Sequence, residues 1–162
     1  MKKILKEYLP FVILIILILL VKNFVVTTIR VNGDSMYPTL KNNDIMLLNK
    51  IGYHFSDIKR FDIVVVQTEN SKIIKRVIGL PGEVVEYKDN VLYINDEVMN
   101  DDYNSILQSD FLVVLEDNEY FVMGDNRGDS LDSRVIGPVL ESDILGHATF
   151  TIFPFNRWGS AK

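Results

Sequence analysis

Residues 83–95 read EVVEYKDNVLYIN, and this stretch decides the fold class. Two runs with alternating apolar residues flank the dipeptide Asp89-Asn90, a pattern typical of a two-stranded β-hairpin. Similar short runs rich in Val, Ile, Tyr, Phe and Thr recur between turn clusters at 44–50, 61–67, 72–79, 111–115, 119–125 and 144–155. The pattern therefore predicts a mostly β domain of antiparallel strands.

Helical periodicity is weak along the same part of the chain. Beyond the first 26 residues no period of 3.6 persists for ten residues, and only the segment 51–60 suggests a turn of helix. No internal repeat, low-complexity tract or linker rich in Pro, Gly or Ser divides this region. We expect one domain over residues 27–162, large enough to hold a core of its own.

The N-terminal segment is apolar. Residues 11–21 read FVILIILILLV, and the apolar character extends over residues 8–26 with only Lys22 and Asn23 as interruptions. A helix needs about 20 mostly apolar residues to span a bilayer, and a lysine near its end can reach the interface. The composition predicts a single transmembrane helix within residues 1–26.

This segment could be either a cleaved secretory signal or an uncleaved membrane anchor. Early lysines and a short apolar run also fit a cleaved secretory signal, but no Ala-x-Ala-like pair of small residues follows the run. We therefore expect an uncleaved anchor. The lysines Lys2, Lys3 and Lys6 place the N-terminus in the cytoplasm and residues 27–162 on the extracytoplasmic side of the cell membrane.

Charge and cysteine content exclude several classes of function. Outside residues 1–26, which carry four Lys and one Glu, the chain holds 13 Lys and Arg and 21 Asp and Glu, a formal charge of −8. An acidic domain without a basic stripe argues against nucleic acid as a partner. The chain has no cysteine, so disulfides, thiol nucleophiles and cysteine-ligated metals are excluded.

A serine stands in the turn-forming stretch GDSMYPTL, residues 33–40. Gly, Asp, Ser and Pro all favour bends, so Ser35 is at first an ordinary turn residue. As a nucleophile it would need a base to accept its proton. The two histidines, His54 and His147, lie in aromatic or apolar stretches that favour a structural role, so nothing around them supports a Ser-His-Asp triad.

A lysine is the alternative base, because burial disfavours the ammonium form and lowers its pKa. In KIIKRVIGLPGE (72–83), Lys75 shares one strand face with Ile73, whereas Arg76 lies on the other. Alternation alone leaves two options open. Either Lys75 lies among apolar neighbours, or it faces water while Arg76 is turned inward or paired.

The third polar cluster is GDNRGDSLDSR, residues 124–134. It fails as a calcium loop, because Arg127, Ser130 and Ile136 occupy the third, sixth and twelfth positions counted from Asp125. The tripeptide Arg-Gly-Asp within it is weak evidence for adhesion. A plain polar loop stays a plausible interpretation.

Taken in order behind an N-terminal anchor, GDSMYPTL, KRVIGLPGE and MGDNRGDSLDSR resemble the bacterial type I signal peptidases, in their Gram-positive form. The likeness extends from the anchor to the terminal FPFNRWG. It implies a β-sheet or barrel-like catalytic domain and a membrane-anchored serine endopeptidase. Such an enzyme removes N-terminal signal peptides from secreted preproteins by cutting after small residues in an Ala-x-Ala-like pattern, with neither cofactor nor metal.

The resemblance also implies roles for the polar residues. Ser35 is the nucleophile and Lys75 the general base. Ser130 hydrogen-bonds the lysine amine and orients it. Asp132 and Arg134 form an ion pair that supports the loop.

Asp125 and Arg127 have a similar supporting role by the same resemblance. The Ser35 backbone N–H is the expected oxyanion donor. Some family members add a serine hydroxyl two positions before the nucleophile, but here that position is Gly33, so the second donor is unassigned.

The resemblance further implies that the substrate peptide pairs in extended form with the strands before the nucleophile and the base, with shallow apolar pockets for small side chains. Met36 and Leu40 help shape the nearer pocket, although core packing explains them equally well. The residues expected to bind substrate are Ile29, Val31, Gly33, Met36, Leu40, Ile73 and Ile74.

The expected partners are secretory preproteins and the lipid bilayer, with the secretion translocon nearby. Phe153, Phe155 and Trp158 beside Arg157 suit the headgroup region, and ordinary core packing is the equal alternative. Three rival functions stay open: a membrane-anchored β module that binds peptides without cutting them, a relative of the self-cleaving repressors, and a processing peptidase for a narrow set of substrates. The repressors need a DNA-binding segment, whose place the apolar anchor takes here.

Overall fold

The structure is a computed structural model that describes residues 2–20, 26–50, 58–103 and 109–161. Side chains of the first helix are described from Tyr8 to Ile18. His54 and most of the helical turn expected at 51–60 lie outside the described residues, as does the part of the expected anchor from 21 to 25.

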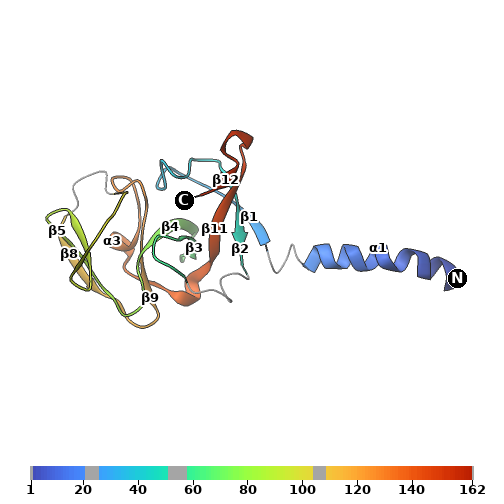
Figure 1. The fold of residues 1–162 in the computed structure, drawn as a ribbon, viewed down its shortest axis with the longest axis horizontal. Helices are drawn as coiled ribbons and strands as arrows, with labels where there is room; N and C mark the ends of the chain where they lie inside the picture. The colour runs from blue at the N-terminus through green and yellow to red at the C-terminus, as the bar shows by residue number, and fades with distance from the viewer. Residues whose placement is uncertain (1, 21–25, 51–57, 104–108, 162) are drawn as a thin grey trace.

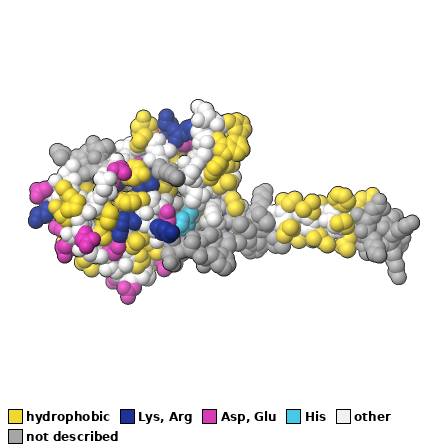
Figure 2. Space-filling view, in the orientation of Figure 1, with side chains coloured by type: hydrophobic (Ala, Val, Ile, Leu, Met, Phe, Trp, Pro, Cys, Tyr) yellow, Lys and Arg dark blue, Asp and Glu magenta, His cyan; other side chains and the backbone are white. Residues whose placement is uncertain are grey.

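Helix α1 (Lys2–Leu20) stands apart from a β-rich body in Figure 1. Its described apolar side chains are about half exposed, from 48% at Val12 to 62% at Phe11, and they are the yellow atoms along that segment in Figure 2. Within the part of the chain that the structure describes, no helix meets the length and hydropathy needed to cross a membrane.

Eight strands of the described chain form the larger sheet, in the order β1-β2-β11-β3-β4-β9-β10 with β12 paired to β11. Every pairing in it is antiparallel. The strands are β1 (Val26–Arg30), β2 (Ile45–Asn49), β3 (Ile63–Gln67), β4 (Lys72–Gly79), β9 (Glu119–Met123), β10 (Val139–Leu140), β11 (Ile144–Phe153) and β12 (Gly159–Ser160).

The remaining strands form a smaller antiparallel sheet in the order β7-β6-β5-β8. They are β5 (Val84–Lys88), β6 (Val91–Ile94), β7 (Glu97–Met99) and β8 (Phe111–Val114). Asp89 and Asn90 join β5 to β6 with φ of 49° and 65°, the left-handed geometry that two-residue hairpin turns require. The predicted hairpin and the mostly β, antiparallel fold are thus confirmed. Among the described residues the body also has the short helical elements α3 (Ser133–Ile136), η2 (Glu141–Asp143) and η3 (Phe155–Arg157).

The two sheets share one core where β4 leads into β5. Phe121 and Met123 of β9 are fully buried against Val85 and Tyr87 of the smaller sheet. Gly79 ends β4 at this junction, and a Cβ built there would lie 2.4 Å from a methyl group of Val85. The absence of a side chain at this position therefore lets the sheets approach closely.

One edge of β4 is only partly paired. From Lys72 to Arg76 the strand pairs with β3. On its other side β9 ends at Met123, opposite Arg76, so Lys72–Lys75 lie beyond that ladder. Four residues of β4 therefore present a strand edge that no other described strand pairs with, beside the turn that carries Ser35.

Candidate active site

Ser35 lies in a tight turn between β1 and β2. The Tyr37 N–H donates to the carbonyl oxygen of Asp34 over 3.0 Å, and the Leu40 N–H donates to Met36 over 2.8 Å. Met36 and Leu40 are 1% and 0% exposed and pack in the core of the larger sheet. Two buried apolar side chains therefore fasten the turn, and the serine is displayed on a rigid support.

Lys75 reaches the serine from β4. Its Nζ donates to the Ser35 Oγ over 2.6 Å, and the lysine is only 3% exposed. Burial lowers the pKa of Lys75, and the negative charges of Asp132 and Asp125 oppose that shift only in part. A lysine with a lowered pKa in contact with a hydroxyl can accept its proton, which makes the serine a nucleophile.

Arg76 is buried as well as Lys75, so the option in which Lys75 faces water is wrong, while the inward, paired Arg76 is found beside a buried Lys75. Its guanidinium makes two hydrogen bonds to Asp125, of 2.8 and 2.7 Å, and both side chains are almost fully buried. The ring of Tyr103 lies 3.9 Å from the guanidinium carbon. The bidentate ion pair fixes the start of the polar loop 124–134 against the strand that carries Lys75.

Asp132 holds the other end of that loop. It accepts the Gly124 backbone N–H over 2.9 Å, caps α3, and forms a bidentate pair with Arg134 at 2.8 Å on each oxygen. Burial opposes ionisation of Asp132, but the hydrogen bonds from Arg134 and Gly124 lower its pKa. This is the ion pair that the sequence predicted between Asp132 and Arg134.

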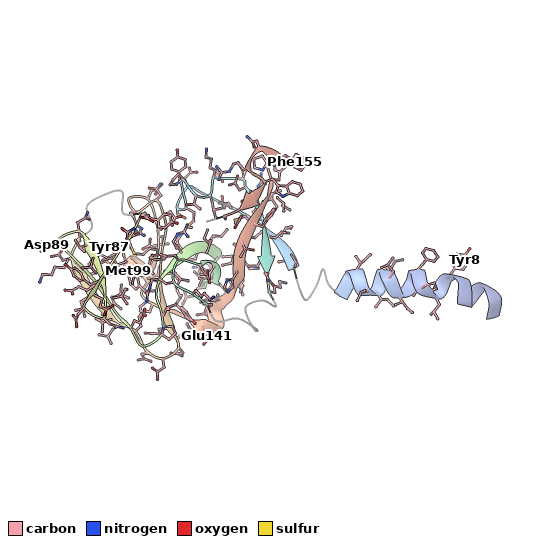
Figure 3. The ribbon with its side chains drawn as sticks, in the orientation of Figure 1. Tyr8, Tyr87, Asp89, Met99, Glu141 and Phe155 are labelled. Carbon is pink, nitrogen blue, oxygen red and sulfur yellow. The ribbon has the colours of Figure 1, made fainter. Side chains whose placement is uncertain are left out.

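Arg127 has a partner that sequence reasoning missed. Its guanidinium binds Asp101, with one contact of 2.9 Å, and donates to the Tyr87 hydroxyl over 2.8 Å. Tyr87, labelled in Figure 3, belongs to the smaller sheet, and its hydroxyl also donates to Asp101. Asp125 and Arg127 both support the loop, Asp125 through its ion pair with Arg76 and Arg127 through its ion pair with Asp101. No local motif marks Asp101, so only the fold could reveal this pairing.

Ser130 lies close to the serine and lysine but makes no bond to the amine. Its Oγ is buried and makes no hydrogen bond of ordinary geometry among the described residues, although it lies near enough to the Asp132 carboxylate to help lower the pKa of that group. A Cβ built at Gly124 would lie 2.3 Å from this oxygen and 2.4 Å from the Ser35 carbonyl oxygen. The hydroxyl therefore packs against the Gly124 backbone, and the expected hydrogen bond to Lys75 does not form in this structure.

A cleft of about 310 Å³ opens beside Ser35 and Lys75. Leu40 does not line it, because its side chain is completely buried in the core. His147 does not line it either and lies 3.4 Å from Asp62. Six of the seven residues expected to bind substrate line the cleft, namely Ile29, Val31, Gly33, Met36, Ile73 and Ile74.

The site contains no arrangement suited to a metal. Over the residues with described positions, no three His, Asp or Glu side chains gather as metal ligands would. What the site does contain is a serine hydroxyl, a buried amine and a cleft for an extended peptide. This set is suited to acyl transfer at a peptide carbonyl.

Comparison with known proteins gives a consistent family. The model of the family "Signal peptidase, peptidase S26" matches residues 4–153. Signal peptidase I S of Bacillus subtilis is 39% identical over 170 residues, covering 96% of this chain and 92% of the relative. Signal peptidase IB of Staphylococcus aureus is 31% identical, covering 97% and 93%. The crystal structure of a signal peptidase I from Enterococcus faecalis superposes with a TM-score of 0.53 at 34% identity, covering 58% of this chain and 98% of that one.

Fold and comparisons together define a serine endopeptidase, an enzyme that hydrolyses peptide bonds. The chain belongs to the peptidase S26 family and is similar to the signal peptidases I of Gram-positive bacteria.

Proposed function

We propose that this enzyme removes signal peptides from secretory preproteins with Ser35 as nucleophile and Lys75 as general base. The observation that carries the proposal is the 2.6 Å contact between Lys75 Nζ and Ser35 Oγ, made by a lysine that is 3% exposed. The idle-module alternative is less favoured, because a module that only binds peptides has no need of a buried lysine in contact with a serine.

The chemistry follows from this pair. Lys75 Nζ takes the proton of the Ser35 hydroxyl while Oγ attacks the scissile carbonyl carbon. The Ser35 backbone N–H donates to the oxyanion of the tetrahedral intermediate. As the intermediate collapses, the lysine ammonium returns the proton to the leaving amine. Lys75 then deprotonates a water, which hydrolyses the ester bond between the acyl group and Ser35.

The free edge of β4 supports an extended substrate. Backbone groups of Lys72–Lys75 lie beyond the β9 ladder and next to the cleft, so a peptide strand can pair there with little demand on its sequence. The apolar lining from Ile29, Val31 and Ile74 favours small apolar side chains, which supports Ala-x-Ala-like cleavage sites. Supporting roles go to Asp125, Arg127, Asp132 and Arg134 through the ion pairs described above.

We also propose a single-pass location in the cell membrane, with the N-terminus in the cytoplasm and residues 27–162 outside. The apolar run 11–21 behind three lysines and the exposed apolar side chains of α1 support an anchor. Substrates held in the same bilayer, near the secretion translocon, would meet the site at a raised effective concentration.

The decisive experiment uses the full-length protein in detergent with a secretory precursor. The wild type is expected to release the signal peptide, whereas Ser35→Ala and Lys75→Ala lose at least about a thousandfold in kcat/KM. Cleavage by either variant at the wild-type rate would refute the dyad. Absence of cleavage by the wild type would favour the peptide-binding module. A panel of precursors would show whether the substrate set is narrow.

A further inference from the structure

Asn126 brackets the nucleophile with two hydrogen bonds. Its side-chain Nδ2 donates to the Asp34 carbonyl oxygen over 3.2 Å, and its backbone N–H donates to the Ser35 carbonyl oxygen over 3.0 Å. One residue of the 124–134 loop therefore binds the two consecutive carbonyl groups on either side of the Ser35 nitrogen and Cα. No role was assigned to Asn126 from the sequence.

The bond to Asp34 bears on the oxyanion donor. In a trans peptide the carbonyl and the following N–H point in opposite directions. A donor that holds the Asp34 oxygen toward the 124–134 loop therefore turns the Ser35 N–H away from that loop. The Tyr37 N–H binds the same oxygen over 3.0 Å from within the turn. Asn126 adds a fixed point outside the turn.

Gly33 makes that fixed point more important. It has φ of +89°, a Cβ built on it would meet nothing within 4 Å, and it has no side chain of its own to restrain the backbone before Asp34; its N–H donates to the Asn42 side-chain oxygen over 3.1 Å. With no side-chain donor at position 33, the Ser35 N–H is the one oxyanion donor assigned among the described residues. Its orientation therefore decides how much the site stabilises the oxyanion.

We propose that Asn126 is a positioning residue for the oxyanion donor: its side-chain amide holds the Asp34–Ser35 peptide so that the Ser35 N–H faces the substrate carbonyl. Asn126 does not touch the oxyanion, because it binds the opposite side of the same peptide group. The inference rests on the proposed function of Ser35.

A purely structural role makes a different prediction. Asn126 follows Asp125, whose ion pair with Arg76 lies next to Lys75 along β4. If Asn126 acted by holding the loop in place, its loss would let water reach Lys75, and the lysine pKa would rise. If it acts on the Ser35 N–H, the lysine is untouched and the acidic limb of the pH–rate profile stays in place.

The test compares wild type, Asn126→Ala and Asn126→Asp of the full-length protein, with Asn118→Ala as control for an exposed asparagine remote from the cleft. Asn126→Asp keeps the size of the side chain but lacks the N–H donor. Steady-state cleavage of a precursor peptide gives kcat and KM across pH. A peptide boronic acid ending at the scissile position supplies a second readout: Ser35 Oγ bonds to boron as its proton passes to Lys75 Nζ, and a boron-bound oxygen occupies the oxyanion position.

Both Asn126 variants are expected to lose about tenfold to hundredfold in kcat above the acidic limb, with KM within twofold. Boronate affinity falls in proportion, while affinity for the same peptide with a plain amide end is unchanged. For Asn126→Ala the acidic limb stays in place.

Three results would overturn the inference: kcat of Asn126→Ala within twofold of wild type, a rise in KM alone, or an acidic limb moved to higher pH. If the wild-type protein does not cleave the precursor, the proposed function fails and this inference falls with it. Unchanged kcat in the variants of an active enzyme refutes the inference alone.

Discussion

Lys75 is buried in an environment that disfavours its charged, ammonium form. Strand β4 carries it into the core, and the loss of water there outweighs the attraction of two nearby carboxylates. Arg134 adds a repulsion in the same direction as burial. The residue is thereby available as a neutral amine nearer to physiological pH than a lysine in water.

The acidic limb of the cleavage rate is expected to report Lys75. Because only the neutral amine can accept the serine proton, kcat/KM falls about tenfold per pH unit below the lysine pKa. Asp125→Asn removes a charge that raises this pKa, so the limb moves to lower pH. The measurement is kcat/KM across pH for wild type and variant. A limb that moves upward would contradict the electrostatic account.

Gly124 is expected to tolerate no side chain. An added Cβ would lie 2.3 Å from Ser130 Oγ and 2.4 Å from the Ser35 carbonyl oxygen, so the nucleophile must shift. A displacement of this size predicts a loss of about a hundredfold in kcat/KM for Gly124→Ala. Gly128→Ala, at an exposed glycine of the same loop, is the matched control and keeps activity within about twofold. Equal activity of the two variants would contradict the packing argument.

At the scale of elements, buried arginine–carboxylate pairs attach the 124–134 loop to both sheets. Arg76 joins it to β4, and Arg127 joins it to Asp101, which lies just beyond β7 of the smaller sheet. Arg134 forms its ion pair within the loop, with Asp132, and Asp132 also caps the N-terminus of α3, where the loop ends. Ion pairs therefore attach the polar loop to both sheets, in place of the backbone hydrogen bonds that attach a strand.

Removal of one partner of a buried pair is expected to be costly. Asp125→Ala leaves the Arg76 guanidinium buried without its carboxylate and lowers the free energy of unfolding by about 3–5 kcal/mol. Urea unfolding followed by circular dichroism measures the change. The double variant Arg76→Met with Asp125→Leu is expected to recover most of it, since no unpaired charge is then buried.

Glu97→Ala, at an exposed position of β7, is the control for the unfolding series and shifts stability by less than about 0.5 kcal/mol. A loss for Asp125→Ala as small as that of the control would mean that water or another group solvates Arg76 in the variant.

At the scale of the whole molecule, an aromatic surface lies at the C-terminal hairpin. Phe153, Phe155 and Trp158 are 47%, 73% and 62% exposed. The ring centre of Phe155 lies 5.7 Å from that of Phe153 and 6.2 Å from that of Trp158. Phe155 projects from the tip of this hairpin in Figure 3. Arg157, expected at the headgroups, instead binds Asp44 and the Thr39 carbonyl oxygen. It thus ties the hairpin to the nucleophile turn.

We propose that the three aromatic rings rest in the interfacial region of the bilayer. For the chain without its first 26 residues, Phe155→Ser with Trp158→Ser is expected to reduce binding to lipid vesicles at least about tenfold in a sedimentation assay. Leu112→Ser, at an exposed apolar residue of β8, is the control. Unchanged vesicle binding by the double variant would remove the proposal. Loss of folding, read by circular dichroism, would show instead that the rings serve packing.

Local sequence patterns predicted much of the fold and the site. The pairings between residues far apart in the sequence could not be predicted from such patterns. The alternation around Asp89-Asn90 was enough for the hairpin, because turn geometry and residue period are local. Three short motifs were enough for the family. Arg76 with Asp125 is 49 positions apart in sequence and Arg127 with Asp101 is 26, and no periodicity relates such residues. Leu40 had two expected roles, in a pocket and in the core, and only the core role is found; the sequence could not separate them because both have the same apolar signature.

The free edge of β4 has a consequence for solubility. An unpaired strand edge rich in isoleucine invites pairing with another copy of itself, and natural sheets commonly oppose this with lysines along the edge. Here Lys72 and Lys75 bound the two isoleucines of the open stretch. We expect the exposed Lys72 to oppose self-association, so that its replacement by a shorter or neutral residue would cause aggregation at high protein concentration.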